Sequence, residues 1–132
     1  MVELKKKEFK FRGKTLEELK TIDVREFAKL LTSRQRRTVL RQFQKIEDFL
    51  NRSKKKLAKK KHIKTHQRDL IIVPQMIGMR IGVYNGREFV NVNVTEQMLG
   101  HFLGEFSLTR SRVKHGGAGV GATKGTKSLS KT

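Results

Sequence analysis

The segment from Ile77 to Val94 constrains the fold most strongly, because its alternating apolar residues flank one turn pair, Asn85-Gly86. Asn-Gly is favoured in two-residue type I′ turns, in which both central residues need positive φ. Such a turn fixes the register as Tyr84 with Arg87, Ile81 with Val90, Met79 with Val92 and Ile77 with Val94. The sequence therefore predicts a hairpin with one apolar face, interrupted only where Val83 would oppose Glu88.

The opposite face of this hairpin is polar and cationic and also carries two aromatic rings. Its members are Arg80, Gly82, Tyr84, Arg87, Phe89, Asn91 and Asn93. Because successive side chains of a strand point to opposite sides, these residues share a surface that the core does not need. This face is the first candidate for ligand binding.

Charge indicates the kind of ligand. The 132 residues carry a net charge of +19, which implies strong self-repulsion unless a polyanion neutralises it. Positions 1–66 hold 22 Lys and Arg against 8 acids, positions 67–115 hold 6 against 4, and positions 116–132 hold 3 against none. The middle part is nearly balanced and is expected to fold, while its flanks supply the positive field. RNA or DNA is the expected partner.

Composition excludes several classes of site and location. The chain has no cysteine, so disulfides and thiolate zinc sites are excluded. Its longest apolar run, Leu70–Val73, is far shorter than a bilayer span, and the N-terminus lacks the apolar core of a signal peptide. We therefore expect a soluble, cytoplasmic protein without a membrane partner. We also expect no metal and no cofactor.

Three helix starts are predicted before position 51. Thr15-Leu-Glu-Glu18 and Asp23-Val-Arg-Glu26 match the capping-box pattern. Ser33 is the expected N-cap of a longer helix, whose apolar stripe is Val39, Phe43, Ile46 and Leu50. We interpret that stripe as core packing rather than as a binding surface.

Two further elements are predicted around the hairpin. Arg68–Val73 has the composition of a strand, which Pro74 would end because proline cannot donate to a ladder. Thr95 is positioned to cap a short helix after the hairpin. Met98, Leu99, Phe102 and Leu103 would pack that helix against the sheet.

Lysine occupies most positions of the stretch Lys54–Lys64. Like charges at this density repel one another on a helix, so the stretch is unusual as a solvated helix face. It could be a solubilising run or a localisation signal, but the basic character of the rest of the chain favours phosphate binding.

The last part of the chain, positions 116–132, holds five glycines and three lysines and no acid or aromatic residue. It cannot bury enough apolar surface to offset the entropy of ordering, so we expect a mobile basic arm. Gly117–Ala122 matches a loose dinucleotide-binding pattern, but no strand precedes it and no βαβ unit surrounds it.

Neither metal nor catalytic chemistry is indicated by the histidines. His62 and His66 are four residues apart, yet they lie among lysines that would repel a cation, and no further ligands are near. His101 has one acid nearby, Glu105, but no second positioned group that general acid-base catalysis would need. We expect no enzymatic activity.

Several motifs together resemble a known family. They are Lys64-Thr-His-x-Arg68, Ile-x-Val-Pro-x-Met-Ile-Gly78, Gly82-Val-Tyr-Asn-Gly-Arg87, Val-Thr-Glu-x-Met-Leu-Gly-His101 and Leu-Gly-Glu-Phe-x-x-Thr-Arg110. In order and spacing they resemble small-subunit ribosomal protein nineteen of the universal nomenclature. The similarity is close over 63–115 and weaker over the preceding helix, and the N-terminal extension looks like that of the archaeal and eukaryotic branch.

The resemblance implies an α+β fold: a small three-stranded mixed β-sheet with flanking helices, an N-terminal helical extension and a flexible basic C-terminal tail. It divides the chain into a basic helical region (1–62), a core (63–115) and a Gly/Lys tail (116–132). It also implies binding to small-subunit rRNA in the head of the subunit, with ribosomal protein thirteen as a neighbour and no homo-oligomer. The tail would approach the decoding region and A-site tRNA.

The expected rRNA-binding residues combine the basic stretch, the polar hairpin face and positions carried over from the resemblance. They are Lys54, Lys55, Lys56, Lys59, Lys60, Lys61, Lys64, Thr65, Arg68, Arg80, Tyr84, Asn85, Gly86, Arg87, Arg110, Arg112, Lys114 and His115. Lys124, Lys127 and Lys131 would lie near tRNA. Gly100, His101 and Gly104 are expected to shape the backbone instead. Arg68→Ala and Arg87→Ala should both weaken subunit incorporation without unfolding the chain.

Two other functions are compatible with parts of the sequence. Charge alone would permit a free nucleic-acid-binding regulator or chromatin-like protein, which would bind duplex DNA as well as structured RNA. An RNA-processing enzyme would need a positioned acid-base pair, and no sequence pattern supplies one.

Overall fold

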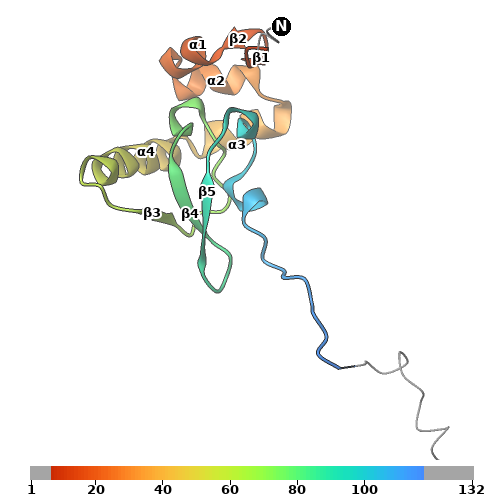
Figure 1. Ribbon diagram of the computed structural model, residues 1–132. Helices are drawn as coiled ribbons and strands as arrows, with labels where there is room; N and C mark the ends of the chain where they lie inside the picture. The colour runs from red at the N-terminus through yellow and green to blue at the C-terminus, as the bar shows by residue number, and fades with distance from the viewer. Residues whose placement is uncertain (1–6, 118–132) are drawn as a thin grey trace, which may run out of the picture.

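Short elements form the N-terminal part of the computed structural model, which describes residues 7–117 (Figure 1). A small antiparallel hairpin and two helices come first: β1 (Lys10–Phe11), β2 (Lys14–Thr15), α1 (Leu16–Thr21) and α2 (Val24–Leu30). The predicted capping box at Thr15 is confirmed, since Glu18 N donates to Thr15 Oγ1 and Thr15 N donates to the Glu18 carboxylate. The second helix also begins where expected, although Asp23 makes no side-chain cap bond.

The single long helix predicted after position 33 is wrong, because the structure contains two. They are α3 (Ser33–Arg41) and α4 (Phe43–Ala58), and Ser33 is the first helical residue rather than the cap. Helical backbone hydrogen bonds continue across the interruption at Gln42, since Gln42 N donates to Thr38 O and Ile46 N donates to Gln42 O. The apolar stripe therefore survives the break: Val39, Ile46 and Leu50 are buried and Phe43 is half-buried.

The predicted three-stranded mixed sheet is confirmed. β3 (Ile63–Thr65) runs parallel to β4 (Arg80–Tyr84), which pairs antiparallel with β5 (Phe89–Asn93). The sheet lies beside α4, while α1 and α2 lie at the N-terminal end of the molecule (Figure 1). Together these elements make an α+β fold.

The hairpin faces are as predicted, but the register is not. Ile81 pairs with Val92 and Val83 with Val90, so the register is shifted by two residues from the expected pairing. The cause is the Asn85 side chain, whose Oδ1 accepts hydrogen bonds from the backbone N of Arg87 and of Glu88, both at 2.9 Å. Because side chains alternate with a period of two residues, a shift of two leaves the faces unchanged. The predicted Val83–Glu88 mismatch disappears.

The predicted strand over Arg68–Val73 is wrong. This segment makes one isolated bridge, between Ile71 and Phe102, although Leu70, Ile71, Ile72 and Val73 are fully buried. Its backbone bonds go to the irregular segment 100–104: Ile72 N donates to His101 O, and Gly100 N donates to Ile72 O. The partner segment is shaped by turns, so the pairing never becomes a regular ladder. The continuous apolar run indicated burial rather than strand geometry.

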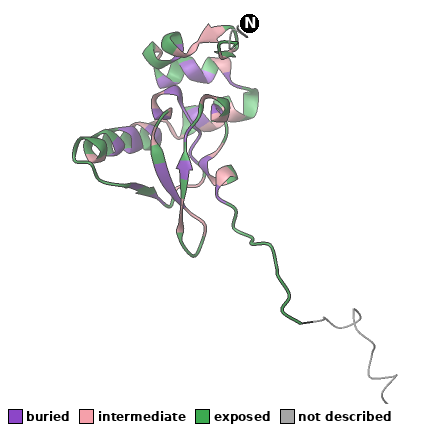
Figure 2. Ribbon diagram, in the orientation of Figure 1, coloured by how far each residue is buried: buried purple, intermediate pink, exposed green. Residues whose placement is uncertain are grey.

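Three short 3₁₀ helices complete the core: η1 (Pro74–Met76), η2 (Glu96–Met98) and η3 (Leu103–Phe106). Thr95 precedes η2 as expected, without a side-chain cap bond. Leu99 and Leu103 do belong to the core cluster, and the partly buried Met98 and Phe102 pack against it. The cluster joins residues from α1 through η3, which places the N-terminal helices and the sheet on one core (Figure 2). Within residues 7–117, no helix is long and apolar enough to cross a bilayer.

Candidate nucleic-acid interface

The side of the sheet turned away from the core forms one mixed polar and aromatic surface. We call it the open sheet face; its members are Lys64, His66, Arg80, Gly82, Tyr84, Phe89, Asn91 and Asn93. Strand alternation places them there, since Gly82 pairs with both Lys64 and Asn91, and Arg80 pairs with Asn93. Its lysine, arginine and asparagine side chains are exposed. β4 and β5 contribute the residues expected from the sequence except Arg87, which lies in the turn, and β3 with the residue after it adds Lys64 and His66.

Three rings of the open sheet face form a cluster. The ring centroids of His66 and Tyr84 are 4.5 Å apart, and each lies 5.1 Å from that of Phe89. Lys64 Nζ lies 5.2 Å from the Phe89 centroid, within the range of a cation–π contact. Gly82 allows this approach: a Cβ there would lie 3.4 Å from both the Lys64 side chain and Phe89 Cβ. The result is a half-exposed aromatic platform with a cation beside it.

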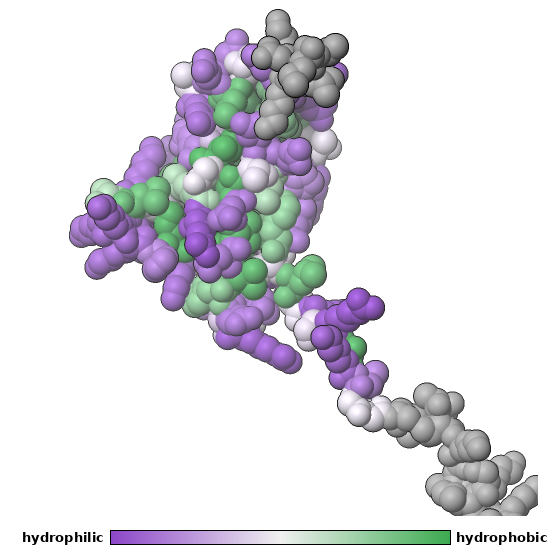
Figure 3. Space-filling view, viewed as in Figure 1, coloured by the Kyte–Doolittle hydropathy of each residue, from purple (hydrophilic) through white to green (hydrophobic). Residues whose placement is uncertain are grey.

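The lysine run consists of Lys54, Lys55, Lys56, Lys59, Lys60 and Lys61, at the C-terminal end of α4. Hydrophilic side chains gather over this end of the molecule (Figure 3). All six are exposed except the half-buried Lys56. The helix ends in a Schellman motif, in which Lys61 N donates to Lys56 O and Lys60 N donates to Leu57 O. Lys60 occupies the left-handed position, with φ +53°, where glycine is the usual residue.

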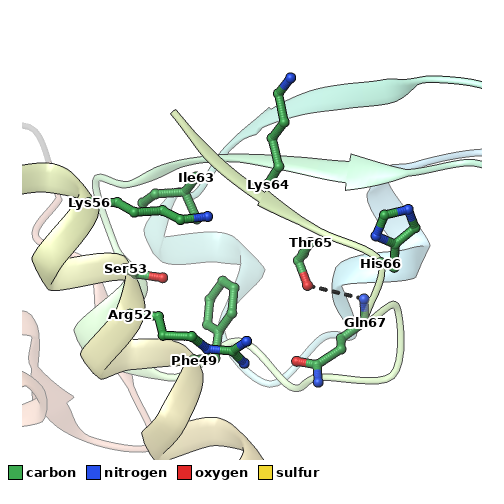
Figure 4. A pocket seen from close by; sticks show the side chains of 9 residues that line it. All are labelled: Phe49, Arg52, Ser53, Lys56, Ile63, Lys64, Thr65, His66 and Gln67. Carbon is green, nitrogen blue, oxygen red and sulfur yellow. Dashed lines mark hydrogen bonds between the residues drawn. The ribbon is translucent and has the colours of Figure 1, made fainter. Parts of the chain in front are cut away.

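A pocket of about 260 Å³ separates α4 from β3. Phe49 and Ile63 are buried apolar parts of its wall, and Arg52, Ser53, Lys56 and Gln67 add polar groups. The Ser53 hydroxyl, the Lys56 amine and the Gln67 amide oxygen all point toward the space between helix and strand (Figure 4). Lys64 and His66 also line the pocket. The pocket therefore connects the lysine run with the open sheet face.

The hairpin turn uses most of its polar groups to hold its own shape. Besides the Asn85 side-chain bonds, Tyr84 Oη donates to Gly86 O at 3.2 Å, and Gly86 has a φ of +99°. The Arg87 side chain is exposed. Of the four turn residues expected to bind RNA, only Arg87 presents an exposed cationic side chain. The other three stabilise the turn conformation that positions Arg87.

Arg68 has an internal structural role that the sequence did not reveal. Its guanidinium donates to the carbonyl oxygens of Tyr84, at 2.6 Å, of Gly104, at 2.8 Å, and of Ser107. Ser107 is fully buried and its Oγ donates to Val83 O at 3.2 Å. These bonds tie the end of β4 to the segment after η3. A contact between Arg68 and RNA stays a prediction.

The glycines expected to shape the backbone do so. Gly100 has a φ of +80°, and a Cβ there would lie 3.0 Å from Leu31. At Gly104 a Cβ would lie 3.0 Å from the carbonyl oxygen and Cβ of Arg68. The chain can cross Arg68 this closely only because Gly104 has no side chain. His101 Nδ1 instead lies 2.8 Å from Glu105 Oε2, in an exposed pair.

The remaining expected contacts lie C-terminal to the core. Arg110, Arg112, Lys114 and His115 are exposed on a segment that runs away from the sheet (Figure 1). The three tail lysines expected near tRNA, Lys124, Lys127 and Lys131, lie outside the described residues. Of the expected contacts in β3, Thr65 is buried, and its Oγ1 accepts a hydrogen bond from Gln67 N at 3.0 Å.

Few of the cations in the described part of the chain are paired with an acid there. Over residues 7–117, the one contact within 4 Å between a basic and an acidic side chain is that of His101 with Glu105. No group of three or more His, Asp or Glu side chains in that range could hold a metal ion. Arg36 is internally engaged in another way, because it donates to the carbonyl oxygens of Ala28, Lys29 and Leu31. The exposed lysines keep their charge available for a polyanion.

Sequence reasoning missed His66 of the open sheet face and Arg52 and Gln67 of the pocket as binding candidates. From the sequence, His66 is part of a family motif and a rejected metal ligand but not an expected RNA contact, although its spacing of two from Lys64 in an extended segment places both side chains on one side. Arg52 and Gln67 reach the pocket through the packing of α4 beside β3. No local pattern reveals that packing.

Comparison with known proteins gives the family. The protein-family model described as ribosomal protein S19 matches residues 32–115 of the sequence. The chain is 47% identical over 124 residues to small ribosomal subunit protein uS19 of Methanocella arvoryzae, covering 93% of this chain and 86% of that protein. It is 46% identical over 123 residues to the protein of the same name in Picrophilus torridus, covering 93% and 80%. The chain therefore belongs to the ribosomal protein S19 family, whose members are structural, non-enzymatic constituents of the small ribosomal subunit.

Proposed function

We propose that this protein binds small-subunit rRNA through the open sheet face and the lysine run, and thereby helps to build the head of the subunit near the decoding A site. The observation that carries the proposal is the cluster of His66, Tyr84 and Phe89 with Lys64 beside it. Sequence-selective RNA recognition commonly stacks unpaired bases on aromatic side chains.

The lysine run supports the same proposal through a different interaction. A backbone phosphate gains by contact with an exposed lysine because counterions are released, whatever the base sequence. The run adjoins the open sheet face through the pocket that Lys56 and Lys64 both line. One RNA segment could therefore contact both surfaces. In this arrangement charge supplies most of the affinity, while the rings and the turn fix the orientation.

Further partners follow from the resemblance to the family. We infer that the protein neighbours ribosomal protein thirteen in the cytoplasmic ribosome, and that residues 116–132 form a separate basic arm toward A-site tRNA. The direction of the exposed segment carrying Arg110, Arg112 and Lys114, away from the core, agrees with an arm that begins there.

The test is a filter-binding titration of the full chain against transcribed small-subunit rRNA over a range of salt concentrations, with duplex DNA of equal length as competitor. If roughly 8 phosphates are contacted, log affinity should fall with log salt at a slope of about −6 to −7. Preference for the rRNA with this slope supports the proposal. A slope near −1 would contradict it, and equal binding to the duplex would favour the free regulator.

A further inference from the structure

The pocket between α4 and β3 holds two buried polar atoms that the fold leaves unpaired. Ser53 is 1% exposed, and neither its Oγ nor the Oε1 of Gln67 has a hydrogen-bond partner among the described residues. Leaving such a group unpaired costs about 1–3 kcal/mol, so native structures generally satisfy them. Both atoms point into the pocket (Figure 4). Their needs differ, because the amide oxygen requires a donor, whereas the hydroxyl can donate or accept.

The size and walls of the pocket suit a flat ring. Its volume is about 260 Å³, whereas one water occupies about 30 Å³ in the liquid. Phe49 and Ile63 supply apolar wall, and the guanidinium of the exposed Arg52 extends from α4 into the same space (Figure 4). A guanidinium plane and an aromatic ring are the two surfaces on which unpaired bases stack in RNA complexes.

A phosphate alone fits this pocket less well than a base does. Phosphodiester oxygens only accept hydrogen bonds, so a phosphate would satisfy Ser53 but would leave Gln67 Oε1 facing another acceptor. The Watson–Crick edge of each RNA base carries both a donor and an acceptor, and it can serve both atoms at once. Lys56 and Lys64, at the same pocket, can then neutralise the phosphates that flank the base.

We propose that the pocket between α4 and β3 receives one unstacked nucleobase of the bound RNA. Ser53 and Gln67 bond to the edge of the base, and Phe49 and Arg52 contact its ring. His66 lines this pocket, and its ring centroid also lies 4.5 Å from that of Tyr84, so a neighbouring base can lie on the aromatic platform. The inference deepens the proposed rRNA binding and rests on it.

The experiment compares base and backbone accessibility in complexes of the full chain with small-subunit rRNA. One reagent modifies the Watson–Crick edges of unpaired bases, and hydroxyl radicals report the backbone. Ser53→Leu fills the pocket with apolar side chain. Asn51→Leu is the matched control, because Asn51 is exposed on α4 and does not line the pocket. Gln67→Leu removes the acceptor from the opposite wall and provides a second test if Ser53→Leu melts without cooperativity.

We expect the wild-type chain and Asn51→Leu to protect one unpaired base. Either pocket variant should restore its reactivity to the level in free RNA while the backbone footprint persists. Affinity should fall about tenfold, or about 1.4 kcal/mol, which is within the range for one stacked base. Identical base reactivity in all variants would overturn the inference, as would protection of the backbone alone at this site.

The outcome also separates the inference from the function on which it rests. If the wild-type chain binds rRNA but no base responds to the pocket variants, the pocket proposal fails and rRNA binding stands. If the wild-type chain does not prefer the rRNA over duplex DNA, the proposed function itself fails.

Discussion

The open sheet face and the lysine run are both basic surfaces, but their chemistry is organised differently. On the sheet, rings spaced by 4.5–5.1 Å are held by strand pairing and by the core behind them. At the end of α4, mostly exposed lysines present charge on long side chains that nothing in the described part of the chain pairs with an acid. Fixed rings can select shape, whereas mobile charges supply affinity that salt removes. Substitutions on the two surfaces should therefore change RNA binding differently. Loss of lysines should reduce the salt dependence of binding, whereas loss of a ring should reduce affinity alone.

Arg68→Ala should have the largest effect, and it should act on the open sheet face. The substitution removes three charge-assisted hydrogen bonds and leaves the carbonyls of Tyr84, Gly104 and Ser107 without that donor. We expect a loss of about 3 kcal/mol in the free energy of unfolding, measured by denaturant titration. Arg80→Ala, at an exposed arginine of the same face, is the control and should change stability by less than about 0.5 kcal/mol. Equal stabilities of the two variants would refute the internal role of Arg68.

This prediction replaces the one made from sequence, in which Arg68 and Arg87 had the same role. Nothing local could have separated them, because the carbonyls that Arg68 binds lie 16, 36 and 39 residues away. The hairpin faces were predictable, because which side of a strand a residue faces depends only on whether its position in the strand is odd or even. Its register depends on the Asn85 side chain accepting two backbone N–H groups, which dipeptide preferences do not specify. The pocket likewise depends on how α4 packs beside β3, and only the chemistry of its lysines was visible beforehand.

Replacing Lys54, Lys55 and Lys59 together by Gln should weaken RNA binding without affecting the fold. All three are exposed. Removing three phosphate contacts should make the salt dependence shallower by about 2, and should weaken binding by tens of fold at about 0.15 M salt. The readout is the slope of log affinity against log salt. An unchanged slope would show that the lysine run does not contact phosphates.

Phe89→Leu should produce the complementary result. Leucine keeps an apolar side chain on β5 but removes the ring that packs with His66 and Tyr84. The loss of one stacking surface should cost about 1–2 kcal/mol of binding free energy. Because no charge is removed, the salt slope should stay as in the wild type. If the slope changed as it does in the lysine variant, the distinction between the two surfaces would be lost.

Lys60→Gly should give the smallest effect, with opposite signs for stability and binding. Lys60 has a φ of +53° at the position after α4 where the Schellman motif favours glycine. A left-handed conformation costs a residue with a side chain about 1–2 kcal/mol. Glycine relieves this strain, but the larger conformational entropy of glycine in the unfolded state offsets part of the gain in stability. We expect the free energy of unfolding to rise by about 0.5 kcal/mol while the salt slope becomes shallower by less than about 1. Lys61→Gly, at the next position and without positive φ, is the control and should not gain stability. A lysine that strains the backbone yet strengthens RNA binding would be explained by its charge. A stability gain in Lys60→Gly without any loss of binding would instead show that the strain at Lys60 serves no phosphate contact.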